Sequence, residues 1–283
     1  MTTVADAEAE PTPAPKAGRN LPAAIGIGVA LGGAVVASLF VDKRAFVGLA
    51  AVAIMAGVVE LSRALRSPAG PLPWVPLAVG AGAVLVAAYT GGTQALVVGT
   101  LLLAVAGAFM TVVADGATRP RAISSVVFVV CYVAFLAGFA VLLAVPSDGP
   151  RRVLALVATV VCSDTGGYAV GVFFGKHPMA PSVSPKKSWE GFGGSAAACA
   201  LCGGLYVPLV LHGAWWQGVL FGLAIVVAAT VGDLSESLIK RDLGIKDMGT
   251  LLPGHGGVMD RIDSLLLAAP VAWALLTAFV PWP

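Results

Sequence analysis

The chain has 283 residues, of which 58% are hydrophobic and only 11% are charged, and its mean hydropathy is +0.92. A soluble domain of this size needs a more polar surface, so the composition excludes a soluble globular protein and favours a polytopic membrane protein. Thirty-five glycines fit this class, because small residues let transmembrane helices approach closely. The net charge of +2 says little about partners, and we expect no nucleic acid among them.

Hydropathy divides the chain into a polar start and a series of apolar windows. Residues 1–20 are rich in Ala, Pro and acidic side chains, and we expect a disordered tail there. Spanning a bilayer takes about 20 mostly apolar residues. Nine windows qualify, namely residues 21–41, 45–62, 72–90, 93–114, 122–145, 152–174, 191–211, 216–234 and 261–281. The sequence therefore predicts an all-α fold with about nine transmembrane helices.

The basic residues orient this arrangement. With the N-terminus in the cytoplasm, thirteen Lys and Arg residues fall on the cytoplasmic side and four on the other side. This asymmetry favours a cytoplasmic N-terminus, and it places polar loops at 175–190 and 235–260 in the cytoplasm. We expect N-terminal transmembrane helices over 21–146 and a C-terminal transmembrane region with both polar loops over 147–283.

Acidic residues at membrane depth are the first candidates for function, because such groups are costly there. Asp164 lies well inside the window 152–174. Glu60 lies near the end of an earlier window, one helical turn before Arg63, and we expect a local ion pair between the two.

Two acidic pairs flank the loop 235–260. Asp233 and Glu236 end one apolar window, and Asp260 and Asp263 begin the next. A spacing of three places each pair on one helix face, so four carboxylates could converge at one depth. A bound Mg²⁺ would relieve their repulsion, since it prefers one or two carboxylates together with phosphate oxygens and water. The alternative is a network of salt bridges with Lys240, Arg241 and Arg261.

The two polar loops offer groups that bind phosphates. Lys176, Lys186 and Lys187 lie in the loop 175–190, and lysines act as point charges on phosphate. The alternative is a loop that only fixes the topology. The loop 235–260 contains His255, Gly256 and Gly257, and glycine-rich backbone before a helix can present N–H groups to phosphate. A structural hydrogen bond is the alternative for His255.

Together these groups favour phosphoryl or nucleotidyl transfer at the cytoplasmic face, where positioning and charge neutralisation carry most of the catalysis. The sequence contains no Walker A motif, no G-x-S-x-G nucleophile elbow and no dinucleotide-binding fingerprint after a strand. An ion-coupled transporter is a remote alternative, since it would spread polar residues at mid-depth through several helices.

The segment "SLIKRDLGIKDMGTLLPGHGGVMDRID", residues 237–263, closely resembles the signature of phosphatidate cytidylyltransferases, the CDP-diacylglycerol synthases. Two further stretches, "SDTGGYAVGVFFGKH" at 163–177 and "SPKKSWEG" at 184–191, are similar to the same family. The chain departs from the family pattern at Gly167, where Ala is usual, near Phe174, where Arg is usual, and at Ser188, where Thr is frequent. The missing Arg removes one expected phosphate contact.

This resemblance implies transfer of CMP from CTP to phosphatidate, with Mg²⁺ and a monovalent cation such as K⁺ as cofactors and a homodimer as the assembly. It also implies a location in the plasma (inner) membrane, with 147–283 as the catalytic region. It implies Asp233 and Asp260 as the main metal ligands. We further expect Asp164 and Glu236 to bind the metal. The expected catalytic residues are Asp233, Lys240, Arg241, His255, Asp260 and Asp263. The residues expected to bind substrates or cofactors are Asp164, Lys176, Ser184, Lys186, Lys187, Ser188, Glu190, Lys246, Asp247, Gly256, Gly257 and Arg261. Ser184, Ser188 and Glu190 could instead cap the following helix. A cytidylyltransferase or a CTP-dependent kinase acting on another lipid is the alternative enzyme.

Overall fold

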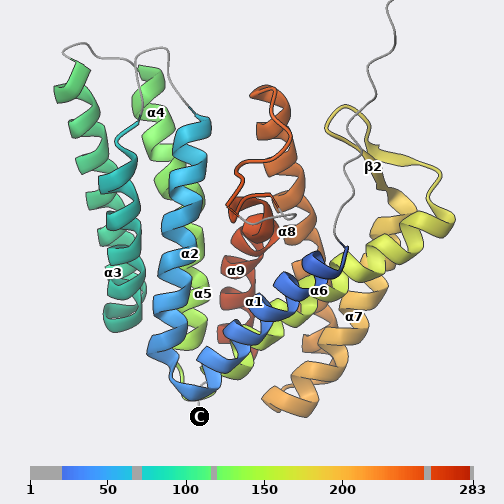
Figure 1. The fold of residues 1–283 in the computed structure, drawn as a ribbon. Coiled ribbons are helices and arrows are strands. Elements are labelled where there is room, and N and C mark those ends of the chain that lie inside the picture. The colour runs from blue at the N-terminus through green and yellow to red at the C-terminus, as the bar shows by residue number, and fades with distance from the viewer. Residues whose placement is uncertain (1–20, 66–71, 116–119, 252–255, 281–283) are drawn as a thin grey trace, which may run out of the picture.

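The structure is a computed structural model that describes residues 21–65, 72–115, 120–251 and 256–280. Within these residues the fold is helical apart from one short hairpin (Figure 1). The elements are α1 (Leu21–Val41), α2 (Lys43–Ala64), α3 (Trp74–Asp115), α4 (Pro120–Val129), the π-helix η1 (Val130–Phe135), α5 (Leu136–Ala144), α6 (Gly149–Phe174), β1 (Pro178–Ala180), β2 (Ser184–Ser188), α7 (Trp189–Leu211), α8 (Trp215–Asp242) and α9 (Met259–Phe279). The 1–20 tail lies outside the described residues.

Seven of the described helical stretches are long and apolar enough to cross a membrane, and a shorter apolar helix covers Ala30–Val41. The prediction of a polytopic membrane protein is therefore confirmed. The longest stretch, α3, is interrupted at Gly92, whose φ of 67° only glycine adopts readily. A Cβ on Gly107 would meet Leu77, and one on Gly80 would meet Leu103, so the two halves of α3 pack antiparallel. Gly92 separates the predicted windows 72–90 and 93–114.

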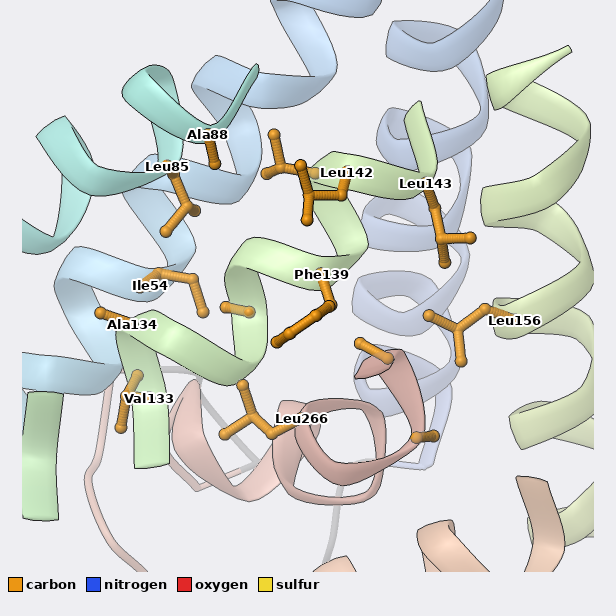
Figure 2. Packing of buried hydrophobic residues seen from close by; sticks show 14 of the residues in the cluster. Ile54, Leu85, Ala88, Val133, Ala134, Phe139, Leu142, Leu143, Leu156 and Leu266 are labelled. Atoms are coloured by element: carbon orange, nitrogen blue, oxygen red, sulfur yellow. The ribbon is translucent and has the colours of Figure 1, made fainter. Parts of the chain in front are cut away.

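The N-terminal helices form one packing unit with α9. Figure 2 shows Ile54 of α2, Leu85 and Ala88 of α3, Phe139 of α5 and Leu266 of α9 around a common buried cluster. Lipid tails are as apolar as these side chains, so close van der Waals packing, and not exclusion of water, holds such helices together. The cluster fixes α9, which begins immediately after the predicted phosphate loop.

Helices α6, α7 and α8 pack through glycines. A Cβ on Gly166 of α6 would lie 2.8 Å from the carbonyl oxygen of Gly194 on α7, and one on Gly203 of α7 would lie 2.2 Å from that of Gly218 on α8. Only glycine allows such a close approach of two backbones. The expectation that small residues bring transmembrane helices together is confirmed for these two contacts.

Arg152 fixes the far end of α9. Its side chain is 1% exposed, pairs with Asp148, and donates hydrogen bonds of 2.9 and 2.8 Å to the carbonyl oxygens of Leu276 and Val280. These carbonyls belong to the last turn of α9, where a cation is favourable. Arg152 therefore anchors α9 at the end opposite the polar loops.

The polar segments differ from the sequence prediction in two places. The loop 175–190 contains the antiparallel β1–β2 hairpin, which the sequence analysis did not predict. Helix α8 continues to Asp242, eight residues beyond the predicted window, so Glu236, Lys240 and Arg241 are helical. In Figure 1 the hairpin, the end of α8 and the segment after it lie toward the top of the view.

Candidate active site

A cavity of about 300 Å³ lies between α6, α7, α8 and the hairpin. This volume is at the lower end of the range for ligand pockets in proteins. It is lined by Ser163, Asp164, Gly167, Tyr168, Gly171, Met179, Lys186, Lys187, Ser188, Gly191, Phe192, Ser195, Ala229, Thr230, Asp233 and Ser264. Of the predicted residues, the cavity brings together two carboxylates, two lysines and Ser188. Charged groups of both signs at one cavity fit a metal-bound polyphosphate.

Glycines of α6 shape one wall. A Cβ on Gly167 would lie 2.4 Å from the hydroxyl oxygen of Ser195, which itself donates a 2.6 Å hydrogen bond to the carbonyl oxygen of Ser163. The family's usual alanine at position 167 would therefore require Ser195 to shift. Asp164 and Tyr168, one turn apart on α6, both line the cavity.

The β1–β2 hairpin carries the lysines to the cavity and is fastened at both ends. At its base, the carboxylate of Glu190 accepts hydrogen bonds from the backbone amides of Lys176 and His177, at 3.1 and 3.2 Å. Near its tip, Nε of Arg241 donates to the carbonyl oxygen of Val183 at 3.2 Å. Glu190 and Arg241 thus position the hairpin. Their direct contact with substrate stays a prediction.

Ser188 begins α7. Its hydroxyl accepts a 3.1 Å hydrogen bond from the amide of Gly191, which confirms the predicted capping role. Ser188 also lines the cavity, so the helix cap and the cavity wall share one residue. Ser184 starts β2 but is not among the residues that line the cavity.

Asp233 connects α8 to the hairpin. Its Oδ2 lies 2.5 Å from Nζ of Lys187, and its Oδ1 accepts a 3.3 Å hydrogen bond from the hydroxyl of Ser237. About a third of the Asp233 side chain is exposed, and it faces the same cavity as Asp164. Asp233 and Asp164 are therefore the two predicted metal ligands that line the cavity.

Asp260 is held by other groups. Nζ of Lys240 lies between two carboxylates, 2.9 Å from Oδ1 of Asp260 and 2.8 Å from Oε2 of Glu236. The other oxygen of Asp260 accepts hydrogen bonds from the amides of Met248 and Gly257, at 3.0 and 2.8 Å. The salt-bridge alternative weighed above thus holds for this part of the acidic cluster. The metal-ligating roles of Asp260 and Glu236 stay predictions.

Asp263 lies beside Glu236, and its Oδ1 accepts a 2.6 Å hydrogen bond from the amide of Ser264. Spacing alone placed four carboxylates at one depth, but only Asp233 lines the cavity, where it pairs with Lys187, while Glu236 and Asp260 share Lys240. Among the described residues, no three His, Cys, Asp or Glu side chains are arranged as a ready metal site. A cation held here would need ligands from the substrate or water.

Glycine is required at position 256, in the turn that precedes α9. Gly256 has a φ of 79°, and a Cβ there would lie 2.9 Å from Oδ2 of Asp260. His255 lies outside the described residues. Four other predicted binding residues, Lys176, Lys246, Asp247 and Arg261, are exposed and do not line the cavity.

Two contacts of Glu60 correct the local ion pair predicted with Arg63. The carboxylate of Glu60 instead accepts hydrogen bonds from the amides of Val258 and Met259. The guanidinium of Arg63 lies over the ring of Trp74, 4.5 Å from its centroid. Glu60 therefore binds the start of α9 and not Arg63. The only sign of this contact in the sequence was a carboxylate within an apolar window.

The sequence analysis also missed uncharged residues of the cavity. Tyr168, Phe192 and Ser195 line it, as do Thr230 and Ser264. Tyr168 and Phe192 follow Asp164 and Ser188 by one helical turn, so helical spacing from the predicted residues could have found them. Thr230 precedes Asp233 by three residues in the same way.

Comparison with known proteins gives a consistent result. A model of the cytidylyltransferase family matches residues 22–279. A phosphatidate cytidylyltransferase of Mycobacterium leprae is 42% identical over 280 residues, which cover 93% of this chain and 89% of the relative. One of Mycobacterium bovis is 40% identical over 276 residues, covering 93% and 90%, and one of Pseudomonas aeruginosa is 51% identical over 128 residues, covering 44% and 47%. A match over nearly the whole length shows that this chain belongs to the cytidylyltransferase family.

Proposed function

We propose that this chain is a phosphatidate cytidylyltransferase, which converts CTP and phosphatidate into CDP-diacylglycerol and diphosphate. Relatives of that name match nine-tenths of the chain. The observation that carries the proposal is the cavity in which Lys186 and Lys187 face Asp164 and Asp233, between helices apolar enough to lie in a membrane. A nucleotide phosphate chain and a lipid phosphate can meet there while the acyl chains stay in the bilayer.

The reaction needs positioning more than acid–base chemistry. The phosphate of phosphatidate is already an anion, so one of its oxygens can attack the α-phosphorus of CTP without a strong base. The new P–O bond forms as the bond to the oxygen bridging the α- and β-phosphorus breaks, and diphosphate leaves with that electron pair. Lys186 and Lys187 lie where they can balance the negative charge of the phosphates and align them.

The chemistry of the donor set fits Mg²⁺. Asp164 and Asp233 are two carboxylates presented to one cavity, and Mg²⁺ is usually bound by one or two carboxylates with phosphate oxygens and water. When bound, the ion would offset the charge on the phosphate oxygens and on the departing diphosphate. Asp233 and Asp164 would hold it on the protein side, while Asp260 holds Lys240 and the glycine-rich turn. A monovalent cation such as K⁺ stays a prediction from the resemblance.

We propose nine membrane spans with the N-terminus in the cytoplasm and the cavity at the cytoplasmic face of the plasma membrane. The antiparallel halves of α3 support the count, because they supply two of the nine predicted windows. The distribution of basic residues supports the orientation. Labelling of single cysteines placed at 176 and 246 with an impermeant reagent, in intact cells and in inverted vesicles, tests it. Both should react only in inverted vesicles.

Most of the proposed catalytic machinery lies in the C-terminal region 147–283, since the cavity is lined only by residues between 163 and 264. This supports the division from an N-terminal helical region at 21–146. The homodimer expected from the resemblance stays a prediction, which cross-linking in the membrane can test.

The decisive experiment uses purified protein in phosphatidate-containing micelles with labelled CTP and Mg²⁺, followed by identification of the lipid product. Labelled CDP-diacylglycerol and stoichiometric diphosphate are expected. CDP formation with a phosphorylated lipid would instead indicate a CTP-dependent kinase. If product forms only with another lipid phosphate, that lipid and not phosphatidate is the substrate. If no CTP is consumed under any condition, the proposed function is wrong.

A further inference from the structure

We propose that Glu60, in the N-terminal helical region, is a positioning residue of the active site that holds the glycine-rich segment carrying Asp260. The inference rests on the proposed function for its kinetic readout, and on geometry for everything else. It assigns a part in the catalytic apparatus to α2, although no residue of α2 lines the cavity.

The contact of Glu60 with the segment is direct and buried. Oε1 accepts a hydrogen bond from the amide of Val258 at 3.1 Å, and Oε2 accepts one from the amide of Met259 at 2.9 Å. Glu60 is 5% exposed, so these bonds form away from solvent. The two amides lie at the N-terminus of α9, where unpaired N–H groups and the helix dipole favour an anion.

Two glycines leave the space that the carboxylate fills. A Cβ on Gly249 would lie 2.3 Å from Oε1 of Glu60, and one on Gly257 would lie 2.4 Å from Oε2. Neither glycine has the positive φ that would by itself require glycine. Close contact with Glu60 is therefore the physical reason for a small residue at these two positions.

The same segment holds Asp260 on its other side. The amides of Met248 and Gly257 both donate to Oδ2 of Asp260, whose Oδ1 contacts Lys240. The α-carbon of Gly257 thus packs against the carboxylate of Glu60, and its amide donates a hydrogen bond to Asp260. The backbone of residues 257–260 separates the two carboxylates, so a shift of this turn would move Asp260 and Lys240 together.

A purely structural role predicts a different pattern from a positioning role. If Glu60 only stabilises the fold, its loss should lower the melting temperature and leave the kinetics of the folded fraction unchanged. If it positions the turn, its loss should alter kcat or the KM for CTP in protein that is still folded. Arg152 is the matched control, because it is a buried charge that binds backbone groups at the opposite end of the same helix.

The experiment compares Glu60→Gln, Glu60→Asp, Gly249→Ala and Arg152→Met in the full-length protein. Kinetics with CTP and phosphatidate, thermal unfolding, and amide hydrogen exchange over residues 244–261 are measured for each. In Glu60→Gln one of the two amides faces an NH₂ group. We expect kcat/KM to fall about tenfold or more, which corresponds to losing one hydrogen bond to a charged acceptor. Exchange of the amides of Met248, Gly257, Val258 and Met259 should quicken.

The other variants complete the comparison. Gly249→Ala should reproduce the kinetic loss by pushing the carboxylate from its place. Glu60→Asp, which keeps the charge, should retain more activity than Glu60→Gln. Arg152→Met should unfold at a lower temperature with the wild-type kcat/KM.

Wild-type kinetics in Glu60→Gln and Gly249→Ala would overturn the inference, as would unchanged exchange of the amides at 248 and 257–259. A kinetic loss no greater than that of Arg152→Met at equal loss of stability would also overturn it. If the wild-type protein itself makes no CDP-diacylglycerol, the proposed function fails. In that case hydrogen exchange still decides whether Glu60 orders the turn.

Discussion

Lys187 on the β1–β2 hairpin forms an ion pair with Asp233 on α8, so the two sides of the cavity are joined by opposite charges. The side chains of Lys187 and Asp233 are 27% and 33% exposed, and both line the cavity. An exposed pair of this kind contributes little to stability. Its importance is that each partner can exchange the other for a group of the substrate or for a cation.

Substituting Lys187 by Ala should weaken the use of CTP. The variant removes a positive charge from the position expected for the phosphates, and a charge-assisted contact of this kind corresponds to a change of about tenfold or more in kcat/KM. Initial rates at varied CTP concentration measure the effect. Arg121→Ala, which removes an exposed charge of α4 away from the cavity, is the control and should behave as wild type. Equal kinetics for the two variants would mean that Lys187 does not act on CTP. The hairpin would then serve only to fix the membrane topology.

Asp164→Asn and Asp233→Asn should both weaken the response to Mg²⁺. Asp233→Asn should lower turnover about a hundredfold or more, because removing a metal ligand takes away several kcal/mol of charge stabilisation. Asp164→Asn should raise the Mg²⁺ concentration required for half-maximal rate. Binding of Mn²⁺ followed by electron paramagnetic resonance gives a readout that does not depend on turnover. Asp242→Asn, at the exposed end of α8, is the matched control. Wild-type Mn²⁺ affinity in both cavity variants would reject them as ligands.

Substituting Lys240 by Met should destabilise the protein, because it leaves Glu236 and Asp260 without their shared cation. The side chains of these two residues are 0% and 5% exposed, and breaking a buried ion pair from one side costs about 3–5 kcal/mol. Thermal unfolding in detergent measures the loss. The double variant with Glu236→Gln should recover part of it, since one uncompensated charge is then removed. No recovery would mean that Lys240 acts mainly through Asp260.

Substituting Gly203 by Ala should disturb the contact between α7 and α8. The new methyl group would lie 2.2 Å from the carbonyl oxygen of Gly218, and overpacking of this kind costs about 1–3 kcal/mol. Gly193→Ala on the same helix is the control, because nothing lies within 4 Å of its added methyl group. Unfolding temperatures should therefore fall for the first variant and hold or rise for the second. Equal values would show that the helices can separate without loss.

The sequence predicted the helices well because hydropathy alone requires them. Each predicted window coincides with a helical stretch, and the division at Gly92 matches a glycine with a positive φ. The hairpin was missed because strands of three and five residues in a Pro- and Lys-rich segment carry no alternating pattern. The last two turns of α8 were missed because they are polar, although their i,i+4 contact between Glu236 and Lys240 is typical of a helix.

The site was predictable in its residue types and less so in its pairings. Spacing placed Asp233 with Glu236 and Asp260 with Asp263 on helix faces, but it could not decide which lysine meets which carboxylate. That choice depends on the hairpin, which brings Lys187 to Asp233, and on the close packing of α8 against α9 at Gly232, whose added Cβ would lie 2.6 Å from the carbonyl oxygen of Asp263. The sequence analysis paired Glu60 with Arg63 because helical spacing relates only residues three or four apart. It cannot predict a hydrogen bond from the amide of Val258, 198 residues away.

The glycine contacts between α6 and α7 have a consequence for how the cavity receives its ligands. Gly167, Gly171 and Gly191 line the cavity, and a Cβ on Gly191 would lie 3.1 Å from the carbonyl oxygen of Gly167 and 3.4 Å from the α-carbon of Gly171. This part of the wall is backbone against backbone, so no side chain of these three residues can change rotamer when a ligand arrives. A wall of this kind is preorganised, and the entropy of shaping it is lost during folding and not again at each encounter. Because this wall cannot adjust, a ligand must match it in shape. A ligand with even one additional methyl group at this wall should therefore bind poorly.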